Sequence, residues 1–280
     1  MREEKMKKFL SVLAVCAVGS VAVGVGSASA FSLGGYTDGV EFVITGLTLS
    51  ADTTYAPPDA FVDTVIPGSG ETWGIFRVTA VQTGDGSSTP LWVQGQDHEQ
   101  IYGLVYGLYD WKYAGSSPDV QISQLGGQFD MYISSTPGHA GEYDITQSRT
   151  AQDAYPTITD IGTAFLTGSF TPGIVADDYT TTIYQNVTST TSPANGAGAG
   201  YGDLTGGTAF SMFNTDGFTD ANGNQRDVHI TFNVANSPSD LWDQKITGPI
   251  QTNPVPIPSA MLLLGTGLAG LVGLRRKSNT

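Results

Sequence analysis

Apolar and polar residues alternate with a period of two along much of the chain. Val40–Leu49 (VEFVITGLTL) and Trp73–Val81 (WGIFRVTAV) are the clearest examples, and both are rich in β-branched and aromatic residues. This pattern predicts β-strands that bury one face. The same reasoning predicts six further strands: Ile101–Tyr113, Gln128–Ile133, Thr163–Phe170, Thr180–Val187, Thr208–Phe213 and Asp227–Val234.

Turn-forming pairs such as Pro57-Pro58, Pro137-Gly138 and Asn222-Gly223 separate the predicted strands. No stretch shows a helical period over three turns. Residues 31–236 are long enough for one all-β domain with a sizeable core. We therefore predict a single β-sandwich, for which a jelly roll is one arrangement.

Two segments depart from the alternating pattern. Thr188–Gly200 (TSTTSPANGAGAG) is small, polar and rich in glycine, so we expect a mobile loop within the sandwich. Residues 237–254 contain three prolines and predict an extended stalk that follows the body. An alternative for this second segment is that Trp242 docks on the sandwich.

The first 30 residues have the three parts of a secretory signal peptide. Arg2–Lys8 carries four basic residues, Phe9–Val25 is apolar, and Ala28 and Ala30 form a small-residue cleavage site. We expect signal peptidase to cut after Ala30. The only cysteine, Cys16, lies within this segment, so the mature chain would have no disulfide framework.

The tail combines a short proline motif, an apolar run and a basic cluster. Val255-Pro256-Ile257-Pro258 precedes 16 uncharged residues, Ser259–Leu274, and Arg275-Arg276-Lys277 follows. As a helix, the uncharged run would be about 24 Å long, against about 30 Å for the hydrocarbon layer of a membrane. Snorkelling basic side chains can make up the difference, which predicts a transmembrane helix at 259–274. The basic cluster predicts a cytoplasmic C-terminus.

Residues 255–280 resemble a PEP-CTERM sorting signal of the Val-Pro-x-Pro type, which is found on exported proteins of Gram-negative bacteria. The resemblance implies processing by an exosortase, transient anchoring in the inner membrane, release to the cell surface or matrix, and a setting of exopolysaccharide and biofilm. Ile257 stands where the family has a glutamate, which leaves the exosortase class and the cleavage point open. The alternative is a permanent single-pass anchor.

Net charge limits the classes of partner that the exported part can bind. The whole chain has a net charge of −14. Both terminal segments are net positive, so residues 31–254 keep 24 acidic and five basic residues, a net charge of −19. Such a chain repels nucleic acid and anionic membranes, which excludes both as partners of the body. Acidity fits solubility outside the cell or binding of divalent cations.

The best ligand candidate is the acidic stretch Asn214–Asp227 (NTDGFTDANGNQRD), which gathers oxygen ligands of the kind that Ca²⁺ prefers. One reading is a calcium site. The other is a metal-free β-hairpin with a type I′ turn at Asn222-Gly223. The candidate calcium ligands are Asp216, Asp220, Asn222, Asn224 and Asp227.

Aromatic residues are concentrated in Ile101–Tyr113 (IYGLVYGLYDWKY). In an unbroken strand, Tyr109, Trp111 and Tyr113 would share one face. Exposed rings in a row can stack on sugar rings, whereas buried ones serve cross-strand packing. Carbohydrate contact and packing are both open from the sequence.

No catalytic motif emerges from the body. It has no nucleophile elbow, phosphate loop, dinucleotide fingerprint or zinc-ligand spacing. Apart from calcium, no cofactor is indicated. We expect a non-enzymatic surface or matrix protein associated with exopolysaccharide. The alternatives are a secreted carbohydrate-active enzyme on a β-sandwich and a permanently anchored binding module.

Overall fold

The computed structural model describes Tyr36 and residues 38–52, 71–135, 163–188, 195–238 and 242–255. Within these ranges the chain is mostly β-structure, with one short helix, α3 (Phe210–Phe213), and one 3-10 turn, η2 (Gln96–His98). The prediction of an all-β protein is confirmed. The strands are β1 (Val40–Asp52), β2 (Glu71–Thr83), β3 (Pro90–Val93), β4 (Gln100–Ser116), β5 (Asp119–Ser134), β6 (Thr163–Thr171), β7 (Ile183–Val187), β8 (Gly196–Gly206), β9 (Phe218–Thr219), β10 (Gln225–Arg226), β11 (Val228–Asn236) and β12 (Gln244–Thr252).

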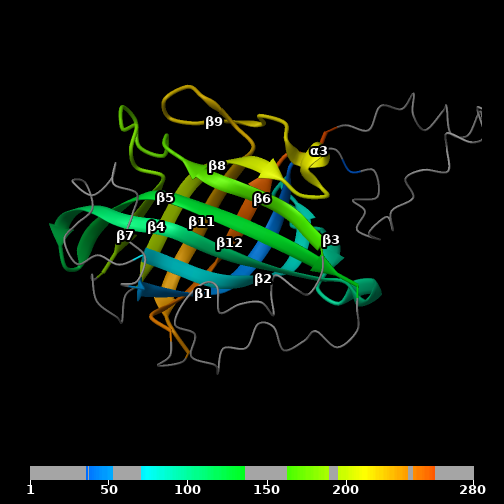
Figure 1. Ribbon diagram of the computed structural model, residues 1–280, viewed down its shortest axis with the longest axis horizontal. Coiled ribbons are helices and arrows are strands. Elements are labelled where there is room, and N and C mark those ends of the chain that lie inside the picture. The colour runs from blue at the N-terminus through cyan, green and yellow to red at the C-terminus, as the bar shows by residue number, and fades with distance from the viewer. Residues whose placement is uncertain are drawn as a thin grey trace, which may run out of the picture. The chain divides into compact units, whose positions relative to one another are not determined.

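Eight strands of a ten-stranded antiparallel sheet form a ring that closes on itself (Figure 1). The order is β1-β12-β11-β8-β6-β5-β4-β2, and β2 pairs with β1 again. Closure depends on β1, which pairs with β12 from Val40 to Thr48 on one side and with β2 on the other. The sandwich prediction is corrected here, because the hydrogen bonding is continuous where a sandwich would have two separate sheets. Both architectures bury alternate residues, so the sequence pattern does not separate them.

The inside of the closed sheet is filled by aliphatic and aromatic side chains from strands all round it. Nine of them border one small internal cavity: Ile44, Phe76, Val105, Phe129, Phe170, Val228, Ile230, Ile246 and Ile250. Glycines directly opposite the rings on the neighbouring, paired strands make room for them. A Cβ on Gly198 would collide with the ring of Phe232, and a Cβ on Gly168 with that of Phe129. Glycine at these strand positions is therefore a packing requirement.

A second hydrophobic cluster lies on the outer face of the sheet. It consists of Leu47, Trp73, Ile75, Tyr102, Leu104 and Trp242, all of them buried. The rings of Trp73 and Trp242 are 5.7 Å apart between centroids. Docking of Trp242 on the body, the alternative to a free stalk, is thus confirmed.

Three local predictions need correction. Residues 244–252 of the predicted stalk are strand β12, in the wall between β1 and β11. Gly196–Gly200 of the predicted loop belong to β8, which pairs with β7 and β11. The predicted strand Thr208–Phe213 contains the helical turn α3 instead. In the first two cases, pairing with neighbouring strands outweighs a composition that disfavours strands.

The predicted signal peptide, 1–30, and the predicted helix, 259–274, lie outside the described residues. So do residues 189–194 of the predicted loop and all of the sorting motif except Val255. Among the residues that are described, no helix is long and apolar enough to cross a membrane.

Candidate functional site

The wall of the closed sheet is interrupted between β6 and β7. These two strands share one position in the sheet, one after the other along it, because both pair with β5 on one side and with β8 on the other. Residues 172–182, which we call the pocket loop, leave the wall between them. At the end of the loop, Thr182 bonds back to β5. Its backbone N–H donates to the carbonyl of Gln124 at 2.8 Å, and its hydroxyl donates to the carbonyl of Gly126 at 2.7 Å. An interruption of this kind places a loop over the outer face of the sheet.

A pocket with a volume of about 450 Å³ lies between the pocket loop and strands β4, β5 and β7. Its floor includes Lys112, Ser123 and Tyr184, which lie in register on three adjacent strands. Ala114 and Gln121 extend the floor, and Ile174, Val175, Ala176 and Asp178 come from the loop. The volume is within the range of roughly 300–1,000 Å³ that is usual for small-molecule sites.

Asp178 is fixed by its own loop. Its carboxylate accepts hydrogen bonds from the backbone N–H groups of Thr180 and Thr181, at 2.8 and 2.9 Å, and from the Thr181 hydroxyl at 2.6 Å. Burial raises the pKa of Asp178, but these bonds and the positive charge of Lys112 outweigh it, so the pKa lies below its ordinary value. The carboxylate is therefore ionised at neutral pH and held at the border of the pocket.

Trp111 connects β4 to the same group. Its indole N–H donates to the Thr181 hydroxyl at 3.2 Å, and that hydroxyl in turn donates to Asp178. The ammonium of Lys112 lies 6.0 Å from the centroid of the Trp111 ring, at the outer limit of a cation–π contact. Trp111 thus helps to hold the loop against the strands.

The three predicted carbohydrate-contacting aromatics do not share a face. The register of β4 against β5 shifts between Asp110 and Lys112, with Trp111 as the extra residue of a bulge. Tyr109 is buried, whereas Tyr113 is 41% exposed and donates its hydroxyl to Asp110 at 2.6 Å. The prediction of a common face assumed an unbroken strand, and the bulge reverses the alternation after Asp110.

The acidic stretch forms the predicted hairpin, made by β9 and β10. The predicted type I′ turn is replaced by a five-residue loop, 220–224, in which Gly223 adopts a positive φ of 85°. The Asp220 carboxylate organises this loop by accepting the backbone N–H groups of Asn222 and Asn224, each at 2.9 Å. An acidic side chain that bonds its own loop is a usual turn device.

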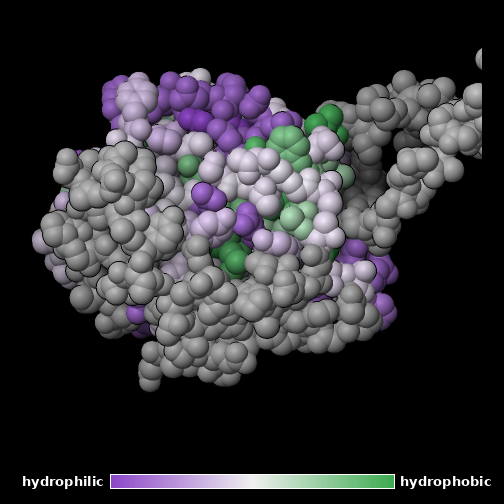
Figure 2. Space-filling model, viewed as in Figure 1, coloured by the Kyte–Doolittle hydropathy of each residue, from purple (hydrophilic) through white to green (hydrophobic). Residues whose placement is uncertain are grey.

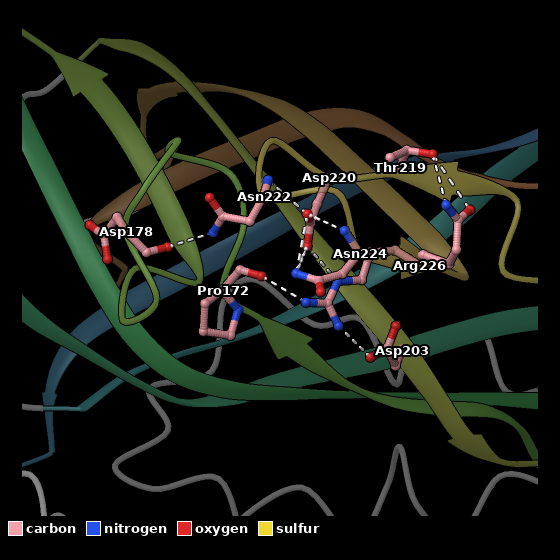
Figure 3. A network of polar contacts seen from close by, with 9 residues as sticks. Pro172, Asp178, Asp203, Thr219, Asp220, Asn222, Asn224 and Arg226 are labelled. Carbon is pink, nitrogen blue, oxygen red and sulfur yellow. Dashed lines mark hydrogen bonds and ion pairs between the residues drawn. The ribbon is translucent and has the colours of Figure 1, made fainter.

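Arg226 pairs with Asp220 of the hairpin and with Asp203 of β8 (Figure 3). Its Nε is 2.9 Å from Asp220, whose side chain is fully buried, and its Nη1 is 2.8 Å from Asp203 on β8. Nη2 donates to the carbonyl of Pro172 at 3.0 Å. Burial raises the pKa of Asp220, but the hydrogen bonds from Asn224, Arg226 and Asn222 outweigh it and lower the pKa below its ordinary value.

Asp227, the last predicted calcium ligand, is engaged elsewhere. Its buried carboxylate accepts the backbone N–H groups of Leu204, Thr215 and Asp216, at 3.0, 2.8 and 2.9 Å. Within the described ranges, no three His, Cys, Asp or Glu side chains are grouped closely enough to hold a metal ion. The oxygens of Asp220 and Asp227 face N–H donors rather than a common centre, so calcium stays a prediction that would require these contacts to rearrange.

The hairpin also supports the pocket loop. Asn222 accepts the backbone N–H of Asp177 at 2.8 Å and donates to the carbonyl of Asp178 at 3.0 Å. Ala221 donates its N–H to the carbonyl of Gly173 at 2.9 Å. Figure 2 shows hydrophilic residues gathered along the edge where Figure 1 places β9. The acidic stretch therefore acts as a brace that fixes Asp178 above the strands.

A row of polar side chains crosses the outer face of four other strands. Glu41 accepts the side-chain amides of Gln82 and Gln251, each at 2.9 Å, and Gln251 Oε1 lies 3.0 Å from Nδ1 of His229. The His229 ring stacks on Tyr201, with centroids 4.7 Å apart. Because Glu41 and His229 are bonded along the sheet rather than toward a cavity, this row is a cross-strand ladder.

Sequence reasoning missed the residues that line the pocket. Lys112, Gln121, Asp178 and Tyr184 come from three strands and a loop, and no spacing in the sequence joins them. One local signal was present, because Asp178 followed by Thr180 and Thr181 is a turn-forming pattern that fixes an aspartate. No model of a known protein family matches the chain, and no curated protein or solved structure matches it either.

Proposed function

We propose that this protein is a non-enzymatic surface or extracellular-matrix protein, exported, processed by an exosortase-like system and associated with exopolysaccharide. The observation that carries the proposal is the ordered set of sequence signals. A signal peptide at 1–30 is combined with Val255–Pro258, the apolar run 259–274 and the basic cluster Arg275–Lys277. Each part is common, but the ordered combination is typical of the PEP-CTERM type of signal.

The position of the sorting motif relative to the body fits this route. Strand β12 ends at Thr252, so Asn253 and Pro254 alone separate the closed sheet from the motif. Val255 is exposed, and its backbone N–H donates to the carbonyl of Met212 at 2.7 Å. The motif that a processing enzyme would recognise is thus separated from the end of the sheet by two residues.

The body is suited to a structural or binding role. Its net charge of −19 opposes nucleic acid and anionic lipid as partners. The pocket beside Asp178 offers binding chemistry, and no motif for a reaction is present in the sequence. Exopolysaccharide as a partner is inferred from the tail and is compatible with that pocket.

Intact mass and cell fractionation of the natural protein test the proposal. We compare the wild type with a variant in which Val255–Pro258 is replaced by Gly-Ser-Gly-Ser. The wild type should lose residues 1–30 and the Arg275–Lys277 cluster and be recovered at the surface or in the matrix. The variant should keep the cluster and stay in the inner membrane.

Two outcomes would contradict the proposal. A wild-type product that retains Arg275–Lys277 in the inner membrane would indicate a permanently anchored module. Turnover of a polysaccharide by the purified protein would indicate the carbohydrate-active enzyme. A variant that lacks the basic cluster, Arg275–Lys277→Ser, serves as a second control, because it should also fail to be sorted although its motif is intact.

A further inference from the structure

The pocket loop carries an exposed aromatic side chain, next in sequence to a residue that lines the pocket. Tyr179 is 72% exposed and directly follows Asp178, which the Thr180 and Thr181 bonds hold in place. The loop that carries it is braced by Asn222, so its backbone is fixed while the ring is open to solvent. A large exposed ring on a well-supported loop contributes little to packing, and such rings are enriched at binding surfaces.

The lining of the pocket combines two kinds of chemistry. Ala114, Ile174, Val175 and Ala176 supply apolar surface, and Tyr184 adds an aromatic ring. Lys112, Gln121 and Ser123 supply hydrogen-bond donors, and Gln121 also accepts. A sugar ring has the matching features, since apolar C–H groups cover its faces and hydroxyls surround its edge.

Asp178 has capacity left for one such hydroxyl. A carboxylate has about four acceptor positions. Three are used, two on Oδ1 by Thr180 and Thr181 backbone N–H groups and one on Oδ2 by the Thr181 hydroxyl. The remaining position on Oδ2 suits a neutral donor, because the carboxylate is already stabilised in its charged form by its own loop.

Charge selects a neutral ligand over an acidic one. Among the described residues, Lys112 is the one cationic side chain that borders the pocket, and its charge already acts on the ionised Asp178, whose pKa it lowers. The chain as a whole carries −14. An acidic polymer would therefore be repelled at long range and would find only one cation that is already compensated.

We propose that the pocket beneath the pocket loop binds a neutral saccharide. Tyr179 and Tyr184 contact the faces of the sugar rings, and Asp178, Lys112 and Gln121 bond their hydroxyls. This inference rests on the proposed function in that it assigns the contact with extracellular polysaccharide to one site. The binding step itself needs neither the sorting motif nor its processing.

Calorimetric titration of the native protein, purified from the cells that produce it, tests the inference. The probes are neutral oligosaccharides of glucose, galactose and mannose, with an oligogalacturonate as the acidic counterpart. At least one neutral probe should bind saturably and the acidic one should not. Tyr179→Ala and Gln121→Ala should each weaken binding about tenfold. Both side chains are exposed, so the melting temperature should not change.

Two matched variants serve as controls. Tyr113→Ala removes an exposed tyrosine whose neighbour Lys112 faces the pocket while Tyr113 itself lies on the opposite face of β4. Lys245→Ala makes the same charge change as Lys112→Ala, at a position in β12 that is not part of the pocket. Binding should be unchanged in both controls and weakened in Lys112→Ala.

Three results would overturn the inference: no neutral probe binds, only the oligogalacturonate binds, or Tyr179→Ala and Gln121→Ala bind like the wild type. Failure of the proposed function is a separate result, because it is read from the mass and location of the native protein. A processed and exported protein that binds no neutral probe would refute the pocket alone. A protein that keeps its tail but binds in the pocket would refute the sorting route alone.

Discussion

Arg226 shows how one residue can decide the role of an acidic stretch. From the sequence, the five candidate ligands between Asp216 and Asp227 indicate either a calcium site or a hairpin. In the structure, a guanidinium from the same stretch lies between Asp220 and Asp203 and reaches the carbonyl of Pro172 (Figure 3). A planar group with five donors can serve three acceptors at once, which a lysine would not do in the same geometry. In this structure, the positive charge that pairs with Asp220 therefore comes from the Arg226 side chain.

We expect Arg226→Met to destabilise the protein by about 3 kcal/mol at neutral pH, because it leaves the buried Asp220 carboxylate without its counter-charge. Urea unfolding of the variant and the wild type measures the difference. Arg77→Met is the control, since Arg77 is an exposed arginine on β2 and its loss should cost much less.

The same comparison has a pH dependence of known sign. The pKa of Asp220 is lower in the folded protein than in the unfolded chain, where it is about 3.9. Its stabilising contribution is complete above that value and is lost as pH falls through the lower, folded-state pKa. Wild type and variant should therefore converge in stability at acid pH. A difference that stays constant from pH 7 to pH 2 would contradict the assigned role of this pair.

At the scale of single elements, β8 (GAGAGYGDLTG) is a strand whose first five residues, Gly196–Gly200, are predicted as part of a loop from composition alone. The glycine at position 198 serves packing rather than chain flexibility. Gly198 lies beneath the ring of Phe232 on β11, which pairs with β8, and a Cβ would collide with that ring. Large rings on one strand and glycines on the next thus form one packed layer, and the strand is specified by its neighbour rather than by its own residues.

We expect Gly198→Ala to destabilise the protein by about 1–3 kcal/mol through overpacking. The closest atoms that a Cβ would meet there belong to side chains, of Phe232 and Gln185, so shortening the ring should relieve the strain. Thermal unfolding of Gly198→Ala, Phe232→Leu and the double variant measures this. The double variant should be more stable than the sum of the single effects predicts.

Gly206→Ala provides the control within the same strand, because a Cβ there would approach only the Thr167 hydroxyl, at 3.1 Å. Equal destabilisation by Gly206→Ala and Gly198→Ala would point to a general intolerance of β8 to side chains and would contradict the ring-over-glycine explanation.

For the molecule as a whole, the decisive feature is that β1 and β12 complete the closed sheet. β12 pairs along its length with β1 and also with β11, so it has no free edge. Pro249 lies within it, opposite Val43, and a proline argues against an internal strand when only the sequence is read. This is why the sequence predicts a stalk at residues 244–252, whereas in the structure they form a strand of the closed sheet.

Deletion of Gln244–Thr252 should abolish cooperative folding, because it exposes the edges of β1 and β11 and opens the interior beside Ile44 and Ile230. Near-ultraviolet circular dichroism and thermal unfolding measure the loss. A stalk, by contrast, could be removed without effect. Removal of residues 259–280 is the matched control and should leave the unfolding transition of the body in place.

The strands with clear alternation, such as Val40–Leu49 and Trp73–Val81, could be found from sequence because the period of two is a local property of each strand. Strands β8 and β12 could not, since glycine and proline hide them until their partners are known. The pocket was equally hidden. Lys112 and Tyr184 are 72 positions apart in the numbering of the chain and become neighbours only through β5, which lies between their strands.

The sequence by itself determined the all-β class, the excess of negative charge and the terminal signals on which the proposed export rests. These are properties of composition and of short segments, and they can be read without knowing the tertiary contacts. Only the tertiary structure decided that the sheet closes, that Arg226 pairs with Asp220 and Asp203 and that a loop between β6 and β7 covers a pocket. Each of these depends on contacts between residues distant in the chain, where many pairings satisfy the same alternation and packing selects one.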